Sequence, residues 1–296
     1  MSQPLPISAI ITHCNRPHLL ACAIESIRRQ TAQPAEIIVV DDCSRPEHRA
    51  TLEKLSSGVR MIYLKESRMA PGARNAGIEA ATHPWIAFLD DDDEWLPQKL
   101  ERQWKIVSQD ESLSAVICAL KVVSSEQPSW NMTSHSPDIM TLGAALDDNL
   151  AMLQSALIRT SVARALGGLD ENLRVFDDQD FWIRFTQAGY RGYCDREPLV
   201  MLNRRPMKRL STAWRSYITS QFKVIAKHRA LYESRGGRWA VHRARSRCIC
   251  RAGLDRGKIM GRILYAGGCI FGGDVRRLVR LIATGKMQII PYGLAE

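Results

Sequence analysis

Short apolar runs separated by helix-like segments characterise the first third of the chain. The runs lie at residues 7–11, 37–40, 61–64 and 85–89, and polar or turn residues bound each of them. Runs of this length predict buried strands. Apolar residues at helical spacing lie between them, as in the segment that follows Pro17. Strands and helices in alternation predict an α/β fold with a mostly parallel sheet.

The pattern becomes less regular after Pro97. The polar stretch 124–138 predicts a long loop that could cover a site. From about Ser211 the chain turns helical and basic. The other elements expected here are a helix to about Gln109, strands over residues 115–123 and 154–159, a turn at Gly167 and Gly168, and a helix over residues 178–188. We therefore expect two domains, residues 1–210 and a basic helical region of residues 211–296.

Acidic residues gather where two of the predicted strands end. Asp41 and Asp42 follow the run 37–40, and the four residues 90–93 are all aspartates that follow the run 85–89. Open α/β sheets bind ligands beyond the carboxyl ends of their strands, and Thr12 also falls at such an end. This shared position makes the strand ends the expected binding site.

The four consecutive aspartates suit a divalent cation. Side chains alternate along an extended chain, so Asp90 and Asp92 are expected to point to one side and Asp91 to the other. Two carboxylates on one side are typical ligands of Mg²⁺ or Mn²⁺, which also hold substrate phosphates. The alternative is a solvated acidic turn that caps the helix after Pro97.

A second acidic cluster, residues 177–180, begins the predicted helix near residue 178. The helix dipole favours the ionised form of Asp178, whereas its neighbours Asp177 and Asp180 raise its pKa, so the sequence leaves the net direction open. An aspartate among aromatic residues suits the removal of a proton from a hydroxyl. The alternative is a set of capping residues on a surface helix.

Composition and charge narrow the class of protein. With 45% hydrophobic and 24% charged residues, the chain is expected to fold rather than stay disordered. Residues 204–296 hold 21 Lys and Arg against four Asp and Glu, which gives them a net charge of +17. Residues 1–203 have a net charge of −7, so the whole chain has +10. The eight cysteines show no disulfide or zinc spacing, which fits a reducing compartment. The chain shows neither a signal peptide nor a spanning apolar segment, so a cytoplasmic protein is expected.

Six motifs in order resemble the family-2 glycosyltransferases of GT-A fold. The resemblance runs from about residue 7 to residue 205, and the motifs are specific as a set rather than singly. They are residues 12–17 (THCNRP), 39–44 (VVDDCS), 72–77 (GARNAG), 88–95 (FLDDDDEW), 167–171 (GGLDE) and 177–184 (DDQDFWIR).

The resemblance implies an inverting, metal-dependent enzyme. It would move a sugar from a nucleotide-diphosphate donor, with a UDP-sugar expected, to a hydroxyl of a glycan or lipid-linked acceptor in cell-surface polysaccharide biosynthesis. The implied catalytic base is Asp178. The implied metal ligands are Asp90 and Asp92, and the implied donor-binding residues are Thr12, Asp41, Asp42, Arg74, Asn75, Asp90 and Asp91.

The chain departs from the family pattern at several positions. Asp177 stands where relatives have Glu, Cys14 replaces a residue that is often aromatic, and Asp91 adds charge beside the metal ligands. A late histidine ligand is not evident; Asn203 begins the segment where relatives often have one.

The basic C-terminal region predicts binding to a polyanion. Arginine-rich helices are attracted to anionic lipid, and apolar residues between 265 and 282 could supply an interfacial face. Nucleic acid is the other candidate, but the front of the chain is acidic and lacks a nucleic-acid motif, so no nucleic acid is expected. We therefore expect a protein that is peripheral on the inner face of the plasma membrane.

Two other functions fit part of the sequence. One is a Mg²⁺-dependent sugar-phosphate nucleotidyltransferase, although residues 12–17 lack the glycines of a phosphate loop. The other is a non-enzymatic polyanion-binding protein, which would not need Asp178 or Asp92.

Overall fold

The computed structural model describes residues 3–124, 130–132, 138–147, 149–204 and 214–254. The chain divides into two compact units. The first consists of Met1–Asn172 and Asp177–Pro206, and the second of Leu173–Phe176 and Met207–Glu296. The short segment Leu173–Phe176 therefore belongs with the C-terminal unit although it lies inside the sequence of the first.

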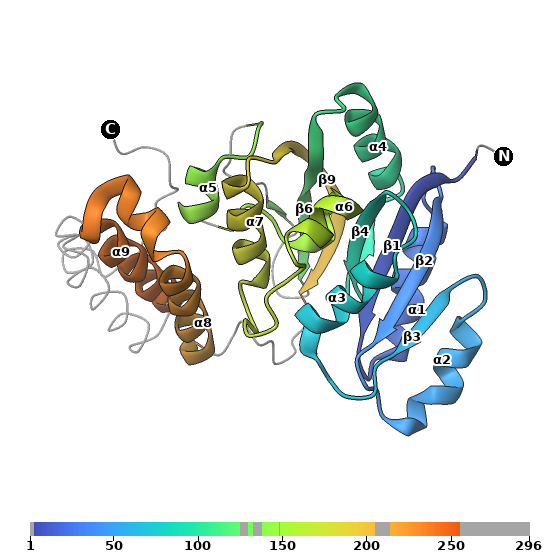
Figure 1. Cartoon of the computed structure of the whole chain (residues 1–296). Coiled ribbons are helices and arrows are strands. Elements are labelled where there is room, and N and C mark those ends of the chain that lie inside the picture. The colour runs from blue at the N-terminus through green and yellow to red at the C-terminus, as the bar shows by residue number, and fades with distance from the viewer. Residues whose placement is uncertain (1–2, 125–129, 133–137, 148, 205–213, 255–296) are drawn as a thin grey trace. The chain divides into compact units, whose positions relative to one another are not determined.

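Over the residues described, the centre of the first unit is a mixed sheet of nine strands (Figure 1). Its first half is parallel, as predicted, in the order β3-β2-β1-β4. These strands are β1 (Leu5–His13), β2 (Pro34–Asp41), β3 (Arg60–Tyr63) and β4 (Trp85–Asp90). The helical elements between them are α1 (Pro17–Arg28), a 3-10 turn (Pro46–His48), α2 (Arg49–Leu55) and α3 (Met69–Ala80).

The register of the parallel strands decides where the site lies. Thr12 of β1 stands opposite Val40 on one side and Asp90 on the other, and His13 stands opposite Asp41. The polar residues at the ends of β1, β2 and β4 are therefore side by side. The apolar residues before them are buried, because both faces of this part of the sheet are covered.

The second half of the sheet is mostly antiparallel. β8 (Ala156–Arg159) pairs antiparallel with β4 and with β6 (Leu113–Ser124), and β6 pairs in parallel with β9 (Arg191–Arg204). Antiparallel pairs also join β9 to β5 (Glu94–Trp95) and β6 to β7 (Trp130–Met132). The helical elements here are α4 (Lys99–Gln109), α5 (Leu142–Asp147), a 3-10 turn (Leu153–Ser155), α6 (Thr160–Ala165) and α7 (Asp177–Gln187).

The structure corrects two sequence expectations in this half. β7 lies inside the stretch predicted to be one long loop, of which residues 125–129 and 133–137 fall outside the described part. β9 has no counterpart among the predicted elements. Its segment contains Pro198, which cannot donate to a strand ladder, and the register with β6 shifts next to that position.

Close packing of α3 on β1 places the residues of α3 near the site. A Cβ at Gly77 would lie 2.4 Å from the Cγ2 atom of Ile10, so the helix or the Ile10 side chain would have to shift to make room for it. Glycine therefore lets the helix approach the strand closely at this position. One turn earlier on the same helix, Arg74 is buried with 8% of its surface exposed.

The C-terminal unit contains two described helices, α8 (Trp214–Lys227) and α9 (Arg229–Leu254). α9 is interrupted at Gly236 and Gly237, and the positive φ of Gly237 (63°) marks the break. No helix in the described ranges is long and apolar enough to cross a membrane. The apolar face predicted between residues 265 and 282 lies entirely outside the described part.

Candidate active site

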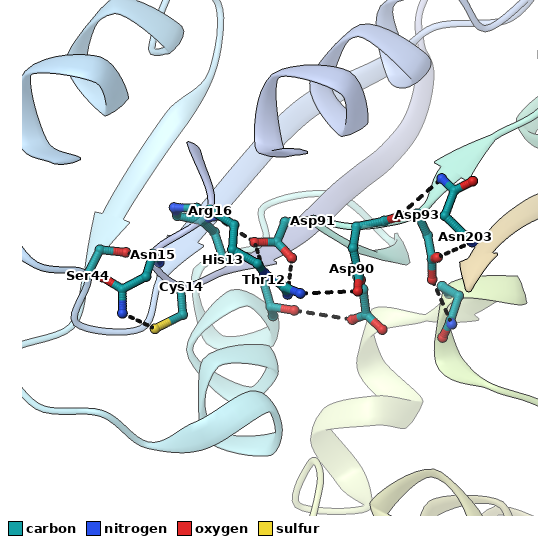
Figure 2. A network of polar contacts seen from close by, with 12 residues as sticks. Thr12, His13, Cys14, Asn15, Arg16, Ser44, Asp90, Asp91, Asp93 and Asn203 are labelled. Carbon is teal, nitrogen blue, oxygen red and sulfur yellow. Dashed lines mark hydrogen bonds and ion pairs between the residues drawn. The ribbon is translucent and has the colours of Figure 1, made fainter. Parts of the chain in front are cut away.

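The ends of β1 and β4 bring the acidic cluster of residues 90–93 beside Thr12 (Figure 2). The Thr12 hydroxyl donates to Oδ1 of Asp90 over 3.3 Å. The side chains of Asp90 and Asp92 are 26% and 23% exposed, whereas that of Asp91 is fully buried. β4 ends at Asp90, and Asp91 and Asp92 lie in the turn that follows it. The expectation that Asp90 and Asp92 point to one side and Asp91 to the other therefore stays a prediction.

Asp91 is engaged inside the protein by two basic side chains. His13 Nδ1 lies 2.7 Å from Oδ2 of Asp91, and Nε and Nη2 of Arg16 bond the same carboxylate. His13 Nε2 lies 3.9 Å from Oδ1 of Asp41, so the histidine stands between the acids of β2 and β4. In this structure the Asp91 carboxylate is bonded by His13 and Arg16. The contact with the nucleotide-sugar donor that the sequence predicts for Asp91 stays a prediction.

Arg16 also reaches Asp92, the predicted metal ligand. Its Nη1 lies 3.1 Å from Oδ2 of Asp92, and 32% of the arginine side chain is exposed. Burial lowers the pKa of Arg16, but Asp91 and Asp92 more than offset this, so the pKa is raised and the guanidinium stays charged. Neither His13 nor Arg16 was singled out from the sequence, although both lie in the first of the six motifs.

Asp93 anchors the acidic turn to the rest of the sheet. Its carboxylate accepts hydrogen bonds from Nε2 of Gln154 (3.1 Å) and from the backbone N–H of Asn203 (3.0 Å). Nδ2 of Asn203 donates to the backbone carbonyl of Asp92 over 3.2 Å. β9, the strand missed from sequence, therefore holds the turn that carries Asp92.

Arg74 connects the two acidic clusters. Its Nη2 lies 2.7 Å from Oδ1 of Asp90, and its Nη1 lies 3.0 Å from Oδ2 of Asp177 at the start of α7. Burial lowers the pKa of Arg74, but the two carboxylates outweigh it, so the pKa is raised. The donor contact predicted for Arg74 stays a prediction; in this structure its two terminal nitrogens bond carboxylates.

Asp178 has the properties expected of a proton acceptor. Burial, followed by the charge of Asp177, raises the pKa of Asp178 to about 7, and hydrogen bonds from Asn149 and from the Gln179 N–H oppose the rise. These two donors lie 2.6 Å and 2.8 Å from the carboxylate oxygens. The sequence left the direction of this shift open, and it gave no signal for Asn149. A carboxyl with a pKa near neutrality suits general base catalysis.

The other predicted donor-binding residues organise loops at the same edge. Asp42 accepts hydrogen bonds from the Arg68 N–H (2.7 Å) and the Ser67 hydroxyl (2.7 Å), and Asp41 accepts from the Ser44 hydroxyl. These contacts hold the loops that follow β2 and β3 at the strand ends. The roles predicted for Thr12, Asp41 and Asp42 stay predictions.

Asn75 holds the turn that leads toward α7. Its side chain accepts from the Leu169 N–H (2.8 Å) and donates to the Leu169 carbonyl (2.9 Å). A Cβ at Gly168, whose φ is +69°, would come 2.4 Å from the Asn75 Oδ1 atom. Asn75 therefore positions the turn, and its predicted donor contact stays a prediction.

Asp90 and Asp92 fit a divalent cation that is held in part by substrate. No group of three or more His, Cys, Asp or Glu side chains suited to a metal occurs in the part of the chain that the structure describes. Mg²⁺ commonly takes only one or two protein carboxylates and completes its shell with water and phosphate oxygens. The partly exposed Asp90 and Asp92 carboxylates match that mode of binding.

Three relatives of known sequence extend these observations. The chain is 27% identical over 197 residues to an "Uncharacterized glycosyltransferase" of Haemophilus influenzae, which covers 66% of this chain and 67% of the relative. It is 34% identical over 207 residues to "Succinoglycan biosynthesis protein ExoO" of Rhizobium meliloti (65% and 58% covered). It is 36% identical over 98 residues to "UDP-Glc:alpha-D-GlcNAc-diphosphoundecaprenol beta-1,3-glucosyltransferase WfgD" of Escherichia coli (33% and 39% covered).

Two solved structures share the fold at low sequence identity. The S. aureus TarS fragment 1–349 in complex with UDP-GlcNAc has a TM-score of 0.61 at 14% identity and covers 95% of this chain and 93% of its own. The mannosyltransferase PcManGT of Pyrobaculum calidifontis, in complex with GDP-Man and Mn²⁺, has a TM-score of 0.57 at 18% identity (96% and 88% covered). The arrangement of sheet and helices is therefore that of GT-A transferases.

The family model "Glycosyl transferase family 2" matches residues 8–165, from β1 through α6. The match includes the strand-end carboxylates and Arg74, and it ends before the second acidic cluster. Because it spans more than half of the 296 residues, the chain belongs to glycosyl transferase family 2.

Proposed function

We propose that this protein is an inverting glycosyltransferase of cell-surface polysaccharide biosynthesis. It moves a sugar from a nucleoside-diphosphate donor, with a UDP-sugar preferred, to a hydroxyl of a glycan or lipid-linked acceptor. One observation carries the proposal: Arg74 forms ion pairs both with Asp90 at the strand ends and with Asp177, the neighbour of Asp178. That link joins a site for phosphate to a candidate base.

The donor side is proposed to lie at Asp90 and Asp92. These carboxylates would hold Mg²⁺ or Mn²⁺, which offsets the charge that develops on the departing diphosphate. Support comes from their partial exposure and from the Mn²⁺ in the GDP-Man complex of PcManGT. Thr12, Asp41, Asp42 and Asn75 are proposed to contact the nucleotide.

The acceptor side is proposed to lie at Asp178. In its ionised form this carboxylate accepts the proton of the acceptor hydroxyl as the oxygen attacks the sugar. Asn149 fixes the orientation of the carboxylate and favours its charged form. A single displacement of this kind inverts the configuration at the anomeric carbon.

The experiment that tests this function combines donor and acceptor screens. The full chain is incubated with UDP-, dTDP- or GDP-sugars, a polyprenyl-diphosphate-linked sugar, and Mn²⁺ or Mg²⁺. One donor is expected to be consumed with the product anomer inverted, and EDTA is expected to abolish turnover. Retention of configuration, or full activity in EDTA, would contradict the corresponding part of the proposal.

The C-terminal unit is proposed to contact an anionic membrane surface, with the catalytic domain over residues 1–210 and the basic region over residues 211–296. Trp239 on α9 is 72% exposed, and Arg243 is exposed one turn further along the same helix. Tryptophan prefers the membrane interface, and each nearby basic residue adds about 1 kcal/mol of attraction to anionic lipid. The acceptor of WfgD, a diphosphoundecaprenol, is a lipid.

Vesicle flotation tests the membrane contact. The protein is expected to float with vesicles that contain phosphatidylglycerol and not with neutral phosphatidylcholine vesicles, and Trp239→Ala is expected to lower the bound fraction. Ile139→Ala is the matched control, since Ile139 is the other exposed large apolar residue among those described. Equal flotation with both kinds of vesicle would refute the electrostatic contact.

A further inference from the structure

The guanidinium of Arg16 bonds two neighbouring carboxylates. Its Nε and Nη2 bond Asp91, and its Nη1 bonds Oδ2 of Asp92 over 3.1 Å. Two nitrogens on one carboxylate make a fork that fixes the guanidinium plane. The third nitrogen is then directed at the carboxylate proposed to bind the metal.

The two contacts of Arg16 differ in how easily they can be broken. The side chain of Asp91 is fully buried and is also bonded by His13, so removing its arginine would leave a buried charge less well compensated. Asp92 is 23% exposed and receives a single hydrogen bond from Arg16, which is itself 32% exposed. Partly exposed ion pairs contribute little to stability, so the contact between Arg16 and Asp92 is the one that can be broken more easily.

The loop before α1 keeps Arg16 in place. Asn15 adopts a left-handed conformation with φ of 58°, its N–H donates to the Ser44 hydroxyl over 2.7 Å, and its Oδ1 accepts from the Arg45 N–H over 2.8 Å. These contacts fix the loop against the residues that follow β2. A loss of the Asp92 contact would therefore leave the guanidinium beside the site, still held by Asp91.

We propose that Arg16 is a positioning residue that acts as a built-in counter-cation of Asp92, which a divalent metal ion must displace in order to bind there. This inference rests on the proposed function, because that function includes the metal. The displaced Nη1 becomes available to an anionic oxygen of the donor. Metal and donor therefore favour each other's binding, and metal alone binds weakly.

The test measures binding of Mn²⁺ alone to the full chain by electron paramagnetic resonance. Arg16→Gln is expected to bind Mn²⁺ about tenfold more tightly than the wild type, since one positive charge next to the ion is removed. Arg29→Gln is the matched control: Arg29 pairs with Glu94 over 3.5 Å, and it is expected to leave the affinity unchanged. Asp92→Asn is expected to abolish Mn²⁺ binding, which would assign the bound ion to this site.

A second variant covers the case in which Arg16→Gln does not fold. Arg16→Lys keeps a charge for the buried Asp91 but lacks the fork and third nitrogen that serve both carboxylates, so about threefold tighter binding is expected. Unchanged or weaker Mn²⁺ affinity in a folded Arg16 variant overturns the inference while leaving the metal site intact. No Mn²⁺ binding by any variant, with or without UDP or GDP, overturns the proposed metal site and the inference with it.

Discussion

The two acidic clusters of this protein contain the same residue type in different electrostatic settings. At the end of β4, His13, Arg16 and Arg74 all contact carboxylates of residues 90–92. At the start of α7, Asp177 has Arg74 as a partner, while Asp178 accepts hydrogen bonds from the neutral donors Asn149 and the Gln179 N–H. Burial raises the pKa of both Asp177 and Asp178.

This difference suits two chemical tasks. Partly exposed carboxylates at a strand end can hold a metal and its phosphates. A carboxyl with neutral partners and a raised pKa exchanges protons near neutral pH. Arg74 is shared by both clusters. Its variants test whether the clusters depend on each other, and the other variants below each test one cluster.

Asp178→Asn should have the largest effect. Without a proton acceptor, kcat is expected to fall by about 10²–10⁴-fold while donor binding is retained. Transfer to the acceptor and the affinity for UDP should be measured in parallel. Asp138→Asn is a suitable control, because its side chain is 70% exposed and lies outside both clusters. A variant that keeps wild-type kcat would show that the second cluster only caps α7.

Arg74→Met should damage both clusters at once. It leaves Asp90 and the buried Asp177 without their shared cation, which is expected to cost about 3–5 kcal/mol of unfolding free energy. Urea denaturation measures this loss. Arg74→Lys keeps the charge but cannot bond both carboxylates equally. Its free energy of unfolding should therefore lie between those of Arg74→Met and the wild type. Unchanged stability in Arg74→Met would mean that the two clusters are independent.

The pH dependence reports on the second cluster alone. Because Asp178 must be ionised to act and its pKa is raised to about 7, kcat/KM is expected to rise with pH through about 7 and then level off. For stability the sign is opposite. The carboxyl ionises near 3.8 when unfolded and near 7 when folded, so its contribution to the unfolding free energy falls as pH rises between these values.

Asn149→Ala sharpens that test. Its hydrogen bond lowers the pKa of Asp178, so its removal should move the midpoint of the kcat/KM profile to higher pH. Gln179→Ala provides a control on the same helix, since the Gln179 side chain donates to the Ala145 carbonyl. A midpoint that does not move would mean that another group sets the profile.

Thr12→Val should have the smallest effect. It removes one hydrogen bond of 3.3 Å to Asp90 and conserves side-chain volume, so a loss of about 1 kcal/mol in transition-state stabilisation is expected. The ratio of kcat/KM values for the two proteins gives that number. A loss above a hundredfold would exceed what this hydrogen bond and the proposed contact of Thr12 with the nucleotide account for.

The predicted α/β order, the strands that lead to Asp41 and Asp90, and the helix after Asp177 were all readable from the sequence and are confirmed. They depend on local periodicity, which a chain displays wherever one face or both faces of an element are buried. The directions of the Asp91 and Asp92 side chains could not be predicted in this way, because β4 ends at Asp90 and these two residues lie in a turn. β9 was not predicted either, because Pro198 and charged residues interrupt its apolar pattern.

Only the tertiary structure decided which basic side chain pairs with which carboxylate. Arg74 and Asp177 lie 103 residues apart and His13 and Asp91 lie 78 apart, yet each pair is in contact. Nothing within a local segment encodes such a pairing, which follows from strand order and from the approach of α3 to β1 at Gly77. The sequence thus determined which chemical groups stand at the strand ends. The fold decided which of them are neutralised, because charge compensation depends on distances that only packing sets.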